Sequence, residues 1–141
     1  MLKDRFPGFR YRSPASEAAI AKVEKTLRLR LPEQLRAMYL ETDGFRENLG
    51  NSKYLLSLSD HDGIGSLVGV TRDHWGGIFG FSRKKFRPYV FFGVSGANYA
   101  WGINASGTEI IQYHHHMEGE YEVVGDSIIE VYERDLASYP T

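Results

Sequence analysis

The spacing of apolar residues predicts a core helix over residues 31–44. The side chains that follow the i, i+4, i+7 and i+8 spacing of one buried helix face are Leu31, Leu35, Met38, Tyr39 and Thr42. Pro32 suits the first helical position, because its missing N–H would have no partner there. Glu33 places a carboxylate at the positive end of the helix dipole, and Gly44 provides the C-terminal stop.

A second helix precedes this one and is predicted to pack against it. Its buried stripe consists of Ile20, Val23 and Leu27. Either Ser13-Pro14 or Ser16 supplies the N-cap. The join over residues 28–32 is short, and short connections keep consecutive elements adjacent in space.

The second half of the chain has the patterns of strands. Residues 89–92 are apolar on both faces, which indicates an interior strand, and residues 99–103 alternate large with small or polar side chains. A hairpin turn over residues 104–107 leads into a strand at 108–113, and a further strand follows at 120–124. Consecutive strands joined by short turns predict a mainly antiparallel sheet of about four to six strands.

The strand at 120–124 and the helix after it have predicted inner and outer sides. Alternation places Tyr121 and Val123 in the core and leaves Glu120 and Glu122 facing water. Asp126 is the predicted cap of the last helix. The inner face of that helix is Ile128, Ile129, Tyr132, Leu136 and Tyr139.

Three further segments complete the predicted order. Residues 1–12 are a basic and aromatic lead-in whose rings tuck against the first helix, residues 54–58 form a short strand, and residues 66–75 are compatible with a helix despite Gly69. We therefore predict an α+β fold, with two N-terminal helices and one C-terminal helix packed on the sheet. At 141 residues, the chain is expected to be a single domain over 1–141.

Composition narrows the classes of partner and compartment. The 17 Lys and Arg against 18 Asp and Glu give a net charge of −1, so no global field favours nucleic acid or a membrane as partner. The absence of cysteine excludes disulfides and Cys-ligated zinc. The N-terminus carries no apolar run of signal-peptide length, and we expect a cytoplasmic protein.

The helix pair carries a resemblance to a known family. Ile20 and Glu24, then Leu31-Pro32 opening a helix that leads to Asp43-Gly44, are similar to the N-terminal signature of the SUKH superfamily. The later order of apolar strand, Gly-rich turn, aromatic strand, hairpin and final helix also resembles that group. The resemblance implies a non-enzymatic protein-binding domain, either an immunity protein that binds and neutralises a cognate toxin or a regulatory scaffold like the fungal regulator of cell-wall assembly.

A histidine run offers an alternative of another class. In an extended strand His114, His116 and Glu118 point to one face, and imidazoles with a carboxylate are ligands suited to zinc or iron. This pattern would suit a His-dependent metal enzyme, but helical patterns flank the sheet where a closed metal-binding barrel would need strands. We predict a solvated strand end here, with no metal, no cofactor and no catalytic residue in the chain.

Acidic residues gather toward the C-terminus and form the predicted partner surface. Its members are Glu118, Glu120, Glu122, Asp126, Glu130 and Glu133, with Asp135 beside them. Such a surface is complementary to a basic protein, for example a toxin nuclease whose own cleft attracts nucleic acid.

Overall fold

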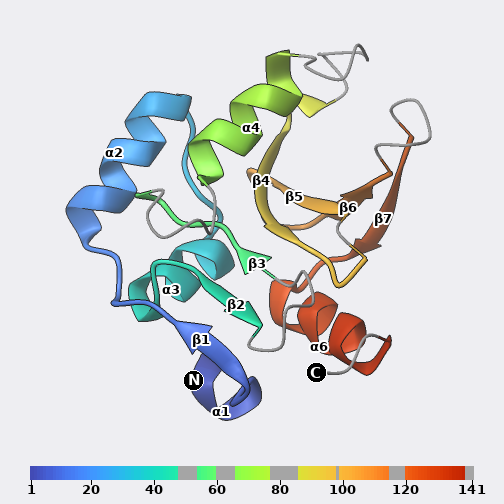
Figure 1. Ribbon diagram of the computed structural model, residues 1–141. Coiled ribbons are helices and arrows are strands. Elements are labelled where there is room, and N and C mark those ends of the chain that lie inside the picture. The colour runs from blue at the N-terminus through green and yellow to red at the C-terminus, as the bar shows by residue number, and fades with distance from the viewer. Residues whose placement is uncertain (48–53, 60–65, 77–85, 98, 115–119, 139–141) are drawn as a thin grey trace.

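The computed structural model describes residues 1–47, 54–59, 66–76, 86–97, 99–114 and 120–138. Seven strands form one antiparallel sheet in the order of the chain, β1-β2-β3-β4-β5-β6-β7 (Figure 1). The strands are β1 (Phe9–Tyr11), β2 (Phe45–Glu47), β3 (Tyr54–Leu55), β4 (Tyr89–Val94), β5 (Ala100–Asn104), β6 (Ile110–Tyr113) and β7 (Tyr121–Gly125). Because neighbours in sequence are neighbours in the sheet, β1 and β7 are its two edges.

Helices lie on both faces of the sheet, so the predicted α+β class is confirmed. They are α1 (Leu2–Arg5), α2 (Glu17–Leu27), α3 (Glu33–Glu41), α4 (Leu67–Gly76) and α6 (Ile128–Ser138). In Figure 1 the curved strands β4 to β7 run between α4 above and α6 below. No helix in the described ranges has the length and apolar character needed to cross a membrane.

Two clusters of buried side chains fill the two faces. The larger one joins α2, α3 and α6 to one face of the sheet, and its strand members include Val90, Phe92, Trp101, Ile103 and Ile110. The smaller one lies beneath α4 and consists of Phe86, Tyr89, Phe91, Ile111 and Tyr113. The apolar residues predicted on both faces of 89–92 divide between these clusters, which is why that strand shows no alternation.

The N-terminal helix pair forms much as its sequence predicts. Ser16 is the N-cap of α2, and its hydroxyl accepts a hydrogen bond from the Ala19 N–H at 3.0 Å. Helix α3 begins directly after Pro32 but ends at Glu41, earlier than the expected stop at Gly44. Gly44 has φ +103°, and an added Cβ would lie 2.9 Å from the Leu55 carbonyl oxygen. That glycine therefore serves the close passage of the chain past β3.

The amide of Gln34 joins α3 to the start of α6. Its nitrogen donates to the Asp126 carbonyl at 2.8 Å and to the Gly107 carbonyl at 3.0 Å, and its oxygen accepts from the Ile128 N–H at 2.7 Å. Asp126 is not the helix cap. Ser127 takes that role, because its hydroxyl accepts from the Glu130 N–H at 3.3 Å. The predicted cap was therefore wrong by one residue.

The short strands explain why the sheet has seven strands where about four to six were expected. The lead-in segment contains α1 and β1, and β1 pairs with β2 with Phe9 opposite Glu47. The rings of Phe6 and Phe9 stack at 5.2 Å, and Phe9 contacts Phe45 at 5.1 Å. The aromatic residues of this segment thus form part of the main core instead of lying against the first helix alone.

Candidate functional site

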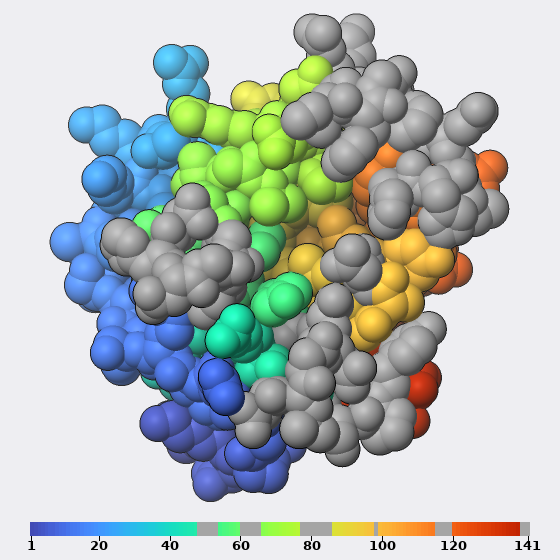
Figure 2. Space-filling view, viewed as in Figure 1, coloured from blue at the N-terminus to red at the C-terminus, as the bar shows by residue number. Residues whose placement is uncertain are grey.

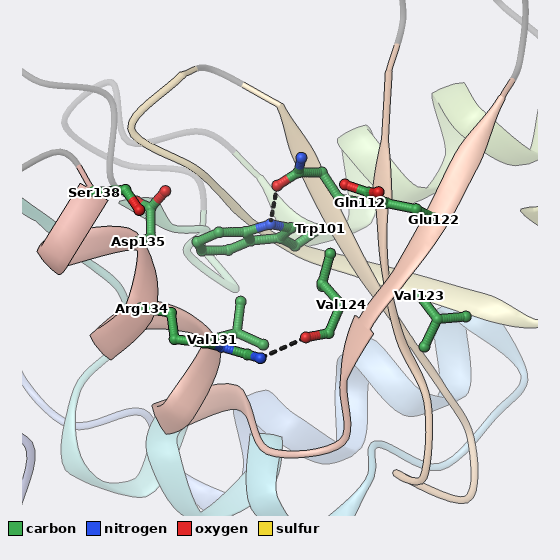
Figure 3. Close-up of a pocket in the computed structure, with 9 residues that line it drawn as sticks. All are labelled: Trp101, Gln112, Glu122, Val123, Val124, Val131, Arg134, Asp135 and Ser138. Atoms are coloured by element: carbon green, nitrogen blue, oxygen red, sulfur yellow. Dashed lines mark hydrogen bonds between the residues drawn. The ribbon is translucent and has the colours of Figure 1, made fainter.

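A cleft of about 410 Å³ lies between the edge strand β7 and helix α6 (Figure 3). Its lining residues are Trp101, Gln112, Glu122, Val123, Val124, Val131, Arg134, Asp135 and Ser138. A sharp turn at residues 125–127 brings the helix back beside the strand. Within the described residues β7 pairs with β6 alone, so one long side of this strand has no partner strand there.

The floor of the cleft is held in one orientation by packing and hydrogen bonding. Trp101 is only 1% exposed, and its indole N–H donates to the side-chain oxygen of Gln112 at 2.9 Å (Figure 3). The Trp101 ring also meets Tyr132 edge-on at 4.8 Å. Because its ring is already buried, Trp101 supports the floor of the cleft from within and keeps it rigid, and the surface open to a partner comes from the more exposed residues around it.

Arg134 closes the lower end of the cleft. Its guanidinium donates to the main-chain carbonyl of Val124, as the dashed line in Figure 3 shows. The side chains of Val124 and Val131 contribute apolar wall between this contact and Trp101. Val124 and Val131 therefore give the lower part of the cleft apolar walls, and the guanidinium of Arg134 there is directed at a carbonyl group.

Two carboxylates stand on the upper rim, one from each element. Glu122 lies on β7, with its side chain 60% exposed and 3.4 Å from the imidazole of His114. Asp135 lies on α6 and accepts from the Gly96 N–H at 2.8 Å. These groups face the opening from opposite sides (Figure 3), so the rim favours a cationic group.

The structure separates the predicted acidic surface into parts. Glu120 and Glu122 are exposed on or just before β7, and Asp126 is exposed in the turn that follows. Glu130 and Glu133 are exposed on α6, but Glu133 pairs with Arg5 of α1 at 3.3 Å. Glu133 is therefore directed away from β7. Glu118 lies outside the described residues.

The prediction that Val123 belongs to the core was wrong. Val123 is 58% exposed, and Val124 packs against the main core in its place. Val123 is directly opposite Ile111 and so shares the face of the smaller core, as the alternation implies, but at this position of the edge strand the side chain stays exposed. The bulge comes after it, at Val124, between the pairs Val123–Ile111 and Gly125–Ile110. Tyr121 is half-buried against the smaller core, as its position in the alternation implies.

The remaining floor residues were not identified as site residues from the sequence. Trp101 and Gln112 are 11 residues apart and pair directly across β5 and β6. Counting outward from the predicted turn at 104–107 would place Trp101 opposite Ile110, because the observed register is centred on residues 105–108, with Ile103 opposite Ile110. The hairpin signal therefore located the two strands but not this pair. Nor does that signal give the position of α6 against the same face.

The predicted metal ligands are only partly described. His114 contacts Glu122, as above, and its ring meets Tyr99 at 4.9 Å. His116 and Glu118 lie outside the described residues. Within the part of the chain that the structure describes, no group of three His, Cys, Asp or Glu side chains is placed to hold a metal ion. The predicted absence of a metal remains a prediction.

Comparison with known proteins identifies the class of protein to which this chain belongs. The fold is that of an α+β protein-interaction domain, and the model of the SMI1/KNR4 family (SUKH-1) matches residues 14–134. The chain therefore belongs to the SMI1/KNR4 family, and the resemblance seen in the sequence is confirmed. The match covers α2 through β7 and most of α6. No curated protein is similar enough to the chain to be matched.

Proposed function

We propose that this domain is an immunity protein that binds a cognate protein toxin through β7 and α6 and neutralises it by occlusion. The binding surface comprises Glu120, Glu122, Val123, Asp126 and Glu130 together with the cleft, and we call it the β7–α6 surface. Family membership supports a protein-interaction domain. The observation that carries the choice of surface is an open edge strand with acidic side chains beside a cleft floored by Trp101.

The charges of this surface favour a basic partner. Three exposed carboxylates follow the course of β7: Glu120 just before the strand, Glu122 on it and Asp126 in the turn after it. The negative potentials of neighbouring carboxylates add. Complementary charge raises the rate of association and sets the orientation of the partner, whereas most of the affinity comes from buried contacts. The exposed Val123 and the half-buried Val124 of the cleft wall supply those apolar contacts.

The proposed action requires no chemistry by this chain. An immunity protein of this kind covers the active site of its toxin or prevents the toxin from reaching its target. A basic nuclease is the toxin class that the acidic surface suits best, because the cleft of such an enzyme already attracts a polyanion. A regulatory scaffold, the alternative within the same family, would use the same surface without protecting a cell from a neighbouring toxin.

A search of the genomic neighbourhood for a toxin gene, followed by co-expression with its product, tests the function. We expect growth to be restored, and the two proteins to purify as one stable complex. Rescue without a complex, together with a covalently modified toxin, would contradict occlusion. Absence of rescue by a chain that still binds a different cellular protein would favour the scaffold.

Association kinetics test the surface. The double variant Glu120→Lys with Glu122→Lys should slow association about tenfold at low salt, and added salt should slow the unmodified pair. The matched control is Asp4→Lys with Asp73→Lys, which makes the same change in net charge at exposed positions outside the β7–α6 surface. Equal effects of the two double variants, or weak salt dependence, would place the binding surface elsewhere.

A further inference from the structure

A second cleft, distinct from the β7–α6 surface, is lined by three arginines. It has a volume of about 490 Å³ and lies at the C-terminal end of α2 beside α4. Its lining residues are Thr26, Leu27, Arg28, Arg72, Trp75, Gly76 and Arg87, and we call it the arginine cleft. Figure 1 shows the end of α2 next to α4, and Figure 2 shows both helices at the surface of the same face of the molecule.

Stacking on Trp75 orients one of the three guanidinium groups. The Arg87 guanidinium lies 4.0 Å from the centre of the Trp75 ring. The indole N–H donates to the Tyr89 carbonyl at 2.8 Å, so the ring itself is held against the sheet. A guanidinium stacked on an aromatic face keeps its N–H groups directed outward in its own plane, where an oxyanion can accept from two of them.

The backbone at Arg28 is unusual for its residue type. Arg28 ends α2 with φ +57°, and it is the one non-glycine residue with positive φ in the described ranges. Its N–H donates to the carbonyl groups of Glu24 and Lys25, which is the C-terminal cap that glycine usually provides. A side chain in this conformation costs about 1 kcal/mol relative to glycine. An arginine thus occupies a position where the helix end alone would favour glycine.

The arginine cleft has an excess of positive charge. Among the described residues that line it there is no carboxylate, and Asp73, next to Arg72 on α4, is not one of them. Guanidinium groups gathered within a Debye length repel one another, and an anion bound among them removes that repulsion.

We propose that the arginine cleft binds a small phosphorylated ligand of nucleotide size. Phosphate oxygens match the planar fork of a guanidinium, and such contacts are the stronger, charge-assisted kind of hydrogen bond. Three arginines from α2, α4 and the segment before β4 converge on one volume, which suits several phosphate oxygens in one ligand. That volume lies in the range of small-molecule sites.

Calorimetric titration of the full chain tests the proposal, with adenosine triphosphate, inorganic phosphate and a single-stranded oligothymidylate as the three probes. We expect saturable one-to-one binding of the nucleotide, with inorganic phosphate binding at the same site more weakly. Arg72→Ala should weaken nucleotide binding about tenfold or more, which corresponds to about 1.4 kcal/mol. The matched control Arg10→Ala, an exposed arginine on β1 outside the cleft, should leave binding unchanged.

Arg28→Gly separates ligand binding from folding. Glycine relieves the positive-φ cost while removing a cation from the helix C-terminus, so the two changes offset and the thermal midpoint should stay nearly constant. Nucleotide affinity should nevertheless fall about tenfold. Absence of saturable nucleotide binding, or equal losses in Arg10→Ala and Arg72→Ala, would overturn the proposal. Binding of the oligothymidylate without binding of the nucleotide would also overturn it and indicate a nucleic-acid strand as the ligand.

Discussion

Tyr132 anchors α6 to the sheet, and its hydroxyl lies directly over Gly93. The side chain is fully buried, and its O–H donates to the Tyr54 carbonyl on β3. A Cβ added at Gly93 would fall on the Tyr132 oxygen, well inside contact distance, and 2.7 Å from the Tyr54 oxygen. The glycine therefore leaves space for the hydrogen bond that positions the helix, and with it the β7–α6 cleft. This arrangement predicts a strong energetic coupling between residues 93 and 132.

The expected magnitudes follow from these contacts. Gly93→Ala must displace either the Tyr132 ring or strand β3, so overpacking and the lost hydrogen bond together should lower the free energy of unfolding by about 3 kcal/mol. Tyr132→Phe leaves the Tyr54 carbonyl without this donor and should cost about 1.5 kcal/mol. In the double variant the closest clash is absent, so the total cost should be below the sum of the single costs by about 1 to 2 kcal/mol.

Urea unfolding of the four proteins measures this double-mutant cycle. The free energies are comparable if the dependence on urea concentration stays constant across the set. Gly69→Ala on α4 is the control, because an added Cβ there meets only ordinary contacts with Ser66 and should stabilise the helix by up to about 1 kcal/mol. Single effects at positions 93 and 132 that add within about 0.5 kcal/mol would refute the proposed contact.

Two further predictions concern β7 and the buried tyrosines. Val123→Asp should change the free energy of unfolding by less than about 0.5 kcal/mol, because the side chain is exposed. Val124→Asp should lower it by about 2 kcal/mol or more, because that side chain packs against the main core. Thermal melts measure both variants, and a lower melting temperature for Val123→Asp than for Val124→Asp would contradict the prediction. Burial raises the pKa of Tyr39 and Tyr132 well above the ordinary value of 10.0. Stability should therefore be independent of these groups below about pH 10 and fall above it, as the unfolded chain loses phenol protons that the folded chain retains. Urea midpoints between about pH 8 and about pH 11 measure this, and a Tyr39→Phe variant with an identical alkaline decline would contradict the role of Tyr39.

The sequence alone determined the elements whose signals are local. Ser16 at the start of α2, Pro32 before α3 and the apolar spacing between them are each read within a few residues, and each predicted the correct helix. The turn signal at 104–107 located the hairpin of β5 and β6 in the same way, although the observed register is centred on residues 105–108. The order of these elements predicted the family, and the match of the SMI1/KNR4 family model to residues 14–134 confirmed it.

Only the tertiary structure decided features that depend on contacts between distant segments. Strands β1 and β2 contain three residues each, too few to show alternation, and they exist because neighbouring strands supply their hydrogen bonds, whereas β3 lies within the strand predicted at 54–58. Val123 keeps the face that alternation predicts, opposite Ile111, but only the tertiary structure decided that this position of the edge strand is exposed.

Both proposed sites belong to this second group. The rim of the β7–α6 cleft joins Glu122 to Asp135 across a turn, and its floor joins them to Trp101 of another strand. The arginine cleft gathers residues 28, 72 and 87 from three separate segments. Charge and residue type are written in the sequence, but the distance between two charges is set by packing of the core, and that distance determines what each surface can bind.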